Sequence, residues 1–133
     1  VIVRFCQASE GKRRLEDLHE NLVSTELPQV TKAVVALATV LNIHPFDDGN
    51  GRTARVLFNV VRSNQLNTKW APLCFPLKRA FSACSGGFEL RLRELETSAN
   101  WIPLISYFHT LLKIELDAID EITFGATHAG NRT

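Results

Sequence analysis

The chain has 133 residues, of which 45% are hydrophobic and 22% charged, a composition typical of one globular domain. A formal net charge of +1 argues against nucleic acid as the principal partner. The three cysteines form no C-x-x-C pair, which favours reduced thiols in the cytoplasm over a disulfide framework. The longest apolar run, residues 30–43, is shorter than the roughly 20 residues of a membrane-spanning helix, so we expect a soluble domain.

The N-terminal part predicts one extended segment followed by helices. The chain begins at Val1 and contains no methionine, so we expect its native start to be missing. Residues 1–6 alternate in the manner of a short β segment, and residues 9–11 predict a turn. From residue 12 to residue 23, leucines recur at the spacing of an amphipathic helix.

The next predicted helix is the buried one. It begins at Thr25 or Glu26, with Pro28 in its first turn, where the missing N–H costs nothing. Residues 30–43 are apolar on nearly all sides, which predicts a helix buried in the core. Pro45 then disfavours helical conformation at the residue before it, so this helix should end at His44.

The second half also reads as helical. Residues 52–63 combine an apolar stripe with a polar one made of Arg52, Arg55, Asn59 and Arg62. The pattern then predicts a connection over residues 64–76, a short helix over 77–84, a turn at 85–87 and a helix over 88–96. Asn100 is a good cap for a last helix that continues to about Ile122. We expect an all-α domain over residues 1–124, with a short β segment at its start, and a flexible tail over residues 125–133.

The stretch over residues 44–55, H-P-F-D-D-G-N-G-R-T-A-R, carries the chemistry. Residues 49–51 place two glycines around an asparagine before a helix, whose first N–H groups and dipole favour an anion. Arg52 and Arg55 lie on one face of the first turn and could add charge-assisted bonds to phosphate oxygens. The alternative is a glycine-rich cap with two solvated arginines, but the combination favours an anion site.

Three further residues complete the predicted site. Asp48 suits a Mg²⁺ ion, which takes one or two carboxylates together with phosphates and waters, while its neighbour Asp47 should diverge from it. His44 is the candidate general base, on the other side of a short loop from the anion site. Phe46 is expected to bury its ring as an anchor. Helix capping for the aspartates and a structural role for His44 are the alternatives.

These twelve residues resemble the signature of Fic domains, H-P-F-x-[D/E]-G-N-G-R-x-x-R, at every specified position. A looser likeness covers roughly residues 15–112. The resemblance implies the mostly helical Fic fold and an enzyme that transfers AMP from ATP to a protein hydroxyl, with release of pyrophosphate. Doc-type relatives that phosphorylate their targets carry Lys at the position of Gly51, so Gly51 favours AMP transfer.

The resemblance also implies a role for each residue. His44 would deprotonate the hydroxyl of a Ser, Thr or Tyr, Phe46 would hold the loop on the core, Asp48 would bind Mg²⁺ between the α- and β-phosphates, Gly49, Asn50 and Gly51 would form the anion hole, and Arg52 and Arg55 would contact the outer phosphates.

Regulation stays open in the sequence. Residues 1–7 resemble a remnant of the β-hairpin flap on which Fic proteins present their targets. Many family members are inhibited by a helix carrying [S/T]-x-x-x-E-[G/N]; the nearest stretch here, residues 6–11, has Cys in place of the hydroxyl residue, and we expect Glu10 to lie in a turn. Inhibition could come from the missing N-terminus, from an antitoxin-like partner, or be absent.

Two functional interpretations remain open. The first is an adenylyltransferase that uses ATP and Mg²⁺ and acts on a target protein. The second is a catalytically idle or repressed nucleotide-binding module, or a Fic-type transferase of another phosphate-containing group. The intact motif, including His44, favours the first. We expect no nucleic-acid or membrane partner, allow for a homo-oligomer, and place the protein in the cytoplasm or, as the alternative, in a host cytosol as a secreted effector.

Overall fold

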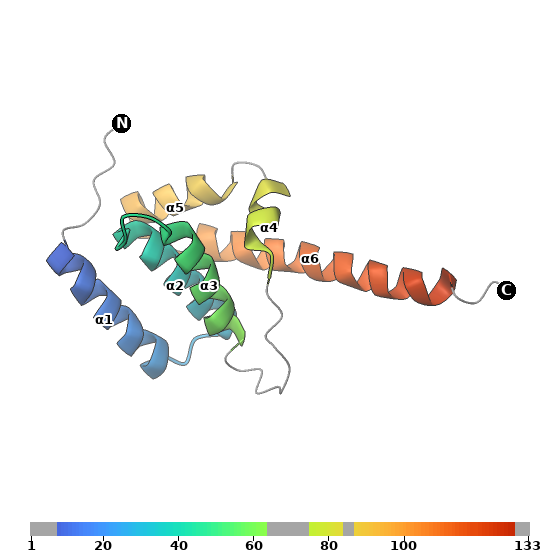
Figure 1. Cartoon of the computed structure of the whole chain (residues 1–133), viewed down its shortest axis with the longest axis horizontal. Helices are drawn as coiled ribbons and strands as arrows, with labels where there is room; N and C mark the ends of the chain where they lie inside the picture. Colours follow the sequence, from blue (N-terminus) through green and yellow to red (C-terminus); the bar gives the residue numbers. More distant parts are fainter. Residues whose placement is uncertain (1–7, 64–74, 84–86, 130–133) are drawn as a thin grey trace. The chain divides into compact units, whose positions relative to one another are not determined.

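A computed structural model describes residues 8–63, 75–83 and 87–129, and these residues contain helices and no strand (Figure 1). The helices are α1 (Ala8–Ser24), α2 (Gln29–Ile43), α3 (Asn50–Ser63), α4 (Leu77–Ala83), α5 (Gly87–Ser98) and α6 (Ile102–Ala129). The prediction of a helical fold is confirmed, while the predicted β segment at residues 1–6 lies outside the described residues. The chain divides into two compact units, Val1–Pro76 and Leu77–Thr133. None of the described helices is long and apolar enough to cross a membrane.

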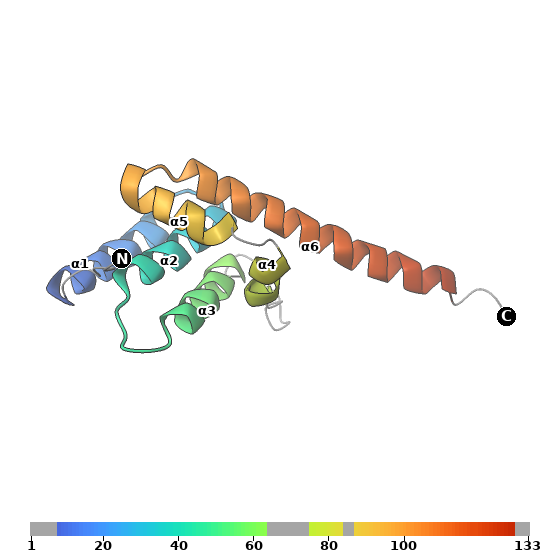
Figure 2. The same cartoon turned by 90° about the horizontal axis from the view of Figure 1, so that it is seen from above.

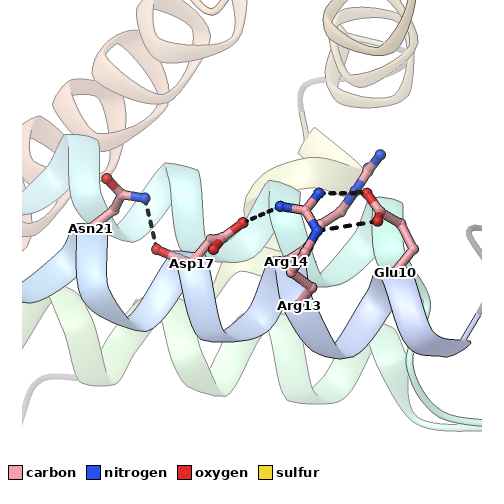
Figure 3. Close-up of polar contacts among 5 residues, drawn as sticks. All are labelled: Glu10, Arg13, Arg14, Asp17 and Asn21. Atoms are coloured by element: carbon pink, nitrogen blue, oxygen red, sulfur yellow. Dashed lines mark hydrogen bonds and ion pairs between the residues drawn. The ribbon is translucent and has the colours of Figure 1, made fainter.

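Helix α1 begins at Ala8, so the prediction of a turn at residues 9–11 is wrong. Glu10 lies in the first helical turn, where the helix dipole favours a carboxylate. Its Oε1 accepts hydrogen bonds of 2.8 Å from Nη2 of Arg13 and from Nε of Arg14 (Figure 3). Side chains three and four residues apart are neighbours on the surface of a helix, so these ion pairs form when the segment is helical. The turn-forming residues at positions 9–11 were therefore misleading.

Helix α2 is the buried centre of the first unit, as predicted. Five of its side chains are completely inaccessible to solvent: Ala33, Val34, Ala36, Leu37 and Ala38. The helix starts later than the sequence predicts, because Pro28 is the N-cap residue and not part of the first turn. Its ψ of 142° is extended, so helical geometry begins only at the next residue.

The N-terminal end of α2 also caps both of its neighbours. Nζ of Lys32 donates to the carbonyl of Leu22 in α1 at 2.8 Å, and Nε2 of Gln29 donates to the carbonyl of Val61 in α3 at 2.6 Å. Such carbonyls at the end of a helix have no partner within it. The two contacts join the start of α2 to the ends of α1 and α3, so both neighbours run antiparallel to α2 (Figures 1 and 2).

Helix α3 has the predicted apolar face, with Ala54 and Phe58 fully buried. The predicted polar stripe is wrong at Asn59, which is only 9% exposed. Its Oδ1 accepts from the N–H of Phe75 at 2.6 Å, and its Nδ2 donates to the carbonyl oxygens of Arg55 at 3.0 Å and Phe75 at 3.3 Å. Asn59 therefore fixes the point at which the chain returns to α3.

The second unit contains α4, α5 and α6, at the places where the sequence predicts helices. Its aromatic cluster joins all three: the rings of Phe81 and Phe88 stack with centroids 4.3 Å apart, and the ring of Phe108 meets each edge-on at 5.9 Å. Arg79 of α4 and Glu115 of α6 form an ion pair of 2.8 Å. Aromatic packing and one long-range ion pair thus hold this unit together.

The ends of α6 confirm one prediction and change another. Oδ1 of Asn100 accepts from the N–H of Ile102 at 3.2 Å, so its side chain caps the helix as predicted. The N-cap position itself is Trp101, whose carbonyl accepts from the N–H of Ile105. At the other end the helix passes Ile122 and continues to Ala129. This stretch contains Gly125 and no proline, and a single glycine costs a helix only about 1 kcal/mol relative to alanine. Residues 125–129, which the pattern assigns to a flexible tail, are therefore helical.

Candidate active site

The loop over residues 44–49 connects α2 to α3 within the first unit (Figure 2). It begins at His44, which ends α2 as predicted: its N–H donates to the carbonyl of Val40 at 3.0 Å, and its side chain is exposed. His44 has φ 53° and ψ 56°, the left-handed conformation in which a residue with a Cβ is strained. The candidate base therefore stands at a position that helix termination alone would assign to glycine or asparagine.

Phe46 is held by its backbone and not by its ring. The side chain is 49% exposed, so the prediction that the ring is buried as an anchor is wrong. Instead, the N–H of Phe46 donates to Oδ1 of Asn50 at 2.9 Å, and Nδ2 of Asn50 donates to the carbonyl of Phe46 at 2.6 Å. Asn50 itself is 3% exposed. Two hydrogen bonds in a buried position hold the loop without any need to bury the ring.

The glycines of the motif occupy different structural positions. Gly49 has φ +85°, a conformation that favours glycine, and its carbonyl accepts the first bond of α3 from the N–H of Thr53 at 2.9 Å. Gly51 lies inside the first turn of α3, so the prediction that both glycines precede the helix is wrong for Gly51. The turn that brings the loop into α3 is thus made at Gly49 alone.

The two arginines of the motif fold back over these glycines. A Cβ added at Gly49 would lie 3.6 Å from Nη2 of Arg52, and one added at Gly51 would lie 3.3 Å from Nη1 of Arg55. Both guanidinium groups are therefore close to the backbone at the start of α3. The first N–H groups of a helix lack partners within it and form the positive end of its dipole. The arrangement concentrates positive charge and hydrogen-bond donors where the sequence predicts an anion site.

Asp48 is the carboxylate that the sequence assigns to a metal. Its Oδ1 accepts from the N–H of Gly49 at 2.6 Å, and its Oδ2 lies 2.9 Å from Nη2 of Arg52. The carboxylate is 89% exposed, and the adjacent Asp47 is exposed as well. The described residues contain no group of three or more His, Cys, Asp and Glu side chains that could hold a metal. A single exposed carboxylate is the kind of ligand that Mg²⁺ takes together with phosphate oxygens and waters.

Comparisons with known proteins agree with the motif. Residues 2–61 match the model of the Fic/DOC family. A stretch of 49 residues is 43% identical to a Drosophila willistoni protein named "Protein adenylyltransferase Fic", and it covers 37% of this chain and 10% of that protein. The matched stretch thus spans about a tenth of this relative. No solved structure gives a significant match. The match to the Fic/DOC family over residues 2–61 includes the whole motif at residues 44–55.

The structure thus brings the predicted site residues into one loop and the first two turns of α3, but it changes what two of them do. Phe46 contributes its backbone N–H and C=O, and the side chain of Asn50 forms hydrogen bonds with both of these groups. The residue type offers a signal for this pairing, because asparagine side chains commonly bond nearby backbone groups at turns and helix starts. The expectation that a phenylalanine buries its ring outweighed this signal.

Proposed function

We propose that this chain is the catalytic part of a Fic-type transferase that moves AMP from ATP to a Ser, Thr or Tyr hydroxyl of a target protein. The observation that carries the proposal is that a candidate anion site and a candidate base lie at opposite ends of one loop. On one side, the guanidinium groups of Arg52 and Arg55 lie over the N-terminal turn of α3. On the other, the exposed His44 ends the buried helix α2. The name of the Drosophila willistoni relative supports AMP as the transferred group.

The reaction requires a base and a site for negative charge. The acceptor oxygen attacks the α-phosphorus of ATP, the bond from this phosphorus to the bridging oxygen of the β-phosphate breaks, and pyrophosphate leaves. His44 takes the proton of the acceptor hydroxyl. The N–H groups at the start of α3, with Arg52 and Arg55, stabilise the charge that develops on the phosphate oxygens. Catalysis would then depend mainly on positioning and electrostatics.

Asp48 is the residue that would hold Mg²⁺. When bound, the ion would neutralise part of the phosphate charge. Arg52 is paired with the same carboxylate, so this ion pair must open or be shared when the ion and the nucleotide bind. The exposure of both side chains makes such a rearrangement inexpensive, since an exposed ion pair contributes only about 0–1 kcal/mol.

The choice between AMP transfer and phosphoryl transfer rests on Gly51. With glycine at this position, the guanidinium of Arg55 lies close to the backbone of the first turn of α3. The lysine found here in the phosphorylating Doc-type relatives would add a third cation beside Arg52 and Arg55. We therefore assign the intact site to AMP transfer.

Labelled ATP distinguishes the candidate reactions. The chain is incubated with Mg²⁺, a cell lysate and ATP labelled at the α- or at the γ-phosphate, and protein-bound label is measured. Label from the α-position only, lost in His44→Ala and retained in His19→Ala, supports the proposal. His19 is an exposed histidine on α1 and serves as the matched control.

Two other results contradict the proposal. Label from the γ-position would identify a kinase. ATP binding without protein labelling would identify the chain as a nucleotide-binding module, or as a transferase of another phosphate-containing group, which a second round with other labelled nucleotides would separate.

A further inference from the structure

Two asparagines on α3 make the same pair of contacts. The side chain of Asn50 accepts from the N–H of Phe46 and donates to its carbonyl, and the side chain of Asn59 does the same with Phe75. The acceptor distances are 2.9 and 2.6 Å, and the donor distances are 2.6 and 3.3 Å, respectively. Both asparagines are buried, at 3% and 9% exposure. A carboxamide has one acceptor and one donor side and therefore matches the N–H and C=O of one residue.

The two asparagines differ in what they hold. Asn59 holds Phe75, at the end of the connection that follows α3. Asn50 holds Phe46, in the middle of the loop over residues 44–49. His44 stands two residues before Phe46, and Asp48 stands two residues after it. The Asn50 contact therefore restrains the backbone on which both candidate catalytic side chains are placed.

We infer that Asn50 is a positioning residue: its side-chain amide holds the backbone of Phe46 and thereby sets the positions of His44 and Asp48. This inference rests on the proposed function for its catalytic consequence, but the loop restraint itself does not. A reacting group must be held to a fraction of an ångström, and the exposed ring of Phe46 supplies little of that restraint. The inference assigns the side chain of Asn50 to the loop and leaves its backbone N–H to the anion site.

The test compares Asn50→Ala with Asn59→Ala. Both changes remove a buried carboxamide from the same helix and leave the N–H and C=O of a phenylalanine without that partner, so both should lower stability by similar amounts. Asn59 also donates to the backbone carbonyl of Arg55 inside α3, but its hydrogen bonds lie outside the loop over residues 44–49. Only Asn50→Ala should therefore release this loop. In the labelled-ATP assay we expect transfer at saturating ATP to fall about 10- to 100-fold, as for other residues that orient a catalytic group. The ATP concentration for half-maximal transfer should change less than about threefold, because the anion site remains.

Amide exchange and NMR resonances give a readout that does not depend on activity. In Asn50→Ala the amide of Phe46 should lose protection from exchange, and the resonances of His44 and Asp48 should shift or broaden. In Asn59→Ala the amide of Phe75 should lose protection, and the resonances of His44 and Asp48 should stay in place. If the wild-type chain transfers no AMP, the proposed function fails, and these spectra still decide the inference.

Asn50→Asp guards against a variant that does not fold. A carboxylate is favoured in the first turn of a helix and keeps an acceptor for the N–H of Phe46, but it cannot donate to the carbonyl. A carboxylate at this position would also repel an anion at the start of α3, so the readout for Asn50→Asp is the spectrum and not transfer. Shifted or broadened resonances of His44 and Asp48 in a folded Asn50→Asp support the inference. Equal activity losses in Asn50→Ala and Asn59→Ala, or unchanged resonances of His44 and Asp48 in both Asn50 variants, would overturn it.

Discussion

The side-chain amide of Asn50 binds both backbone polar groups of Phe46, at 2.9 and 2.6 Å, while the phenylalanine ring is left half exposed. The aromatic residue of the motif is thus held through its peptide groups. This relationship links the start of α3, where an anion would bind, to the loop that carries His44 and Asp48. A substitution at Asn50 should therefore alter the positions of His44 and Asp48.

The conformation of His44 predicts a conflict between stability and activity. Its φ of 53° is strained for any residue with a Cβ, so His44→Gly should raise the free energy of unfolding by up to about 1 kcal/mol while abolishing AMP transfer. Thermal or urea unfolding measures the first effect. The control is His19→Gly, which places glycine inside α1 and should lower stability by about 1 kcal/mol. Equal destabilisation by both changes would contradict this explanation.

The two glycines of the motif should respond to alanine with opposite signs. Gly49→Ala forces a Cβ into a backbone with φ +85° and should lower the free energy of unfolding by about 1 kcal/mol or more, although the Cβ itself has room. Gly51→Ala replaces glycine in a helix and should raise it by up to about 1 kcal/mol, less the cost of moving Arg55 by a few tenths of an ångström. Urea unfolding of both variants tests the pair, and a change of the same sign in both would show that the assignment of Gly49 as the turning residue is wrong.

Asp48→Asn should separate stability from metal use. Its ion pair with Arg52 is exposed, so the free energy of unfolding should change by less than about 1 kcal/mol. The Mg²⁺ concentration needed for half-maximal transfer should rise at least about tenfold, because the carboxylate that would bind the ion is lost. Asp17→Asn, which removes an exposed ion pair with Arg13 on α1, is the control and should leave the Mg²⁺ requirement unchanged. An unchanged requirement in Asp48→Asn would remove this residue from the metal site.

The ion pairs of α1 predict a dependence of stability on pH. Hydrogen bonds from Arg13, and then from Arg14, lower the pKa of Glu10 from 4.5 to about 2 (Figure 3). Because the folded state holds this carboxylate ionised, its contribution is complete above pH 4.5 and is lost as the pH falls through about 2.

Between these two values, the free energy of unfolding of the wild type should fall more steeply than that of Glu10→Gln. Urea unfolding followed by circular dichroism over this range measures the difference. Glu20→Gln, at another exposed position of α1, is the control. Titration of the Glu10 carboxyl near pH 4.5 in an NMR experiment would contradict the prediction.

Periodicity predicts the helices of this chain well and their ends less well. The buried helix α2 follows from a run of apolar residues that no surface helix would contain, and its end follows from the proline after His44. The start of α1 was predicted four residues too late. Residues 9–11 resemble a turn by type, and the ion pairs of Glu10 form only after the helix is in place. The end of α6 was predicted too early, because a single glycine destabilises a helix but does not end it.

The sequence by itself determined which residues form the candidate site. Two glycines, two arginines, an aspartate and a histidine within twelve residues indicate an anion site more strongly than a simple connection between helices. It also determined the helix on either side. Only the tertiary structure decided which groups of Phe46, Asn50 and Asn59 are buried. A pattern of residue types assigns burial by polarity, so it places a phenylalanine inside and an asparagine outside. Here the hydrogen-bonding demand of two backbone segments is met by buried carboxamides. The demand of Phe75 arises only where the chain returns to α3, and the demand of Phe46 depends on the path of the loop, so neither follows from the polarity of the residues.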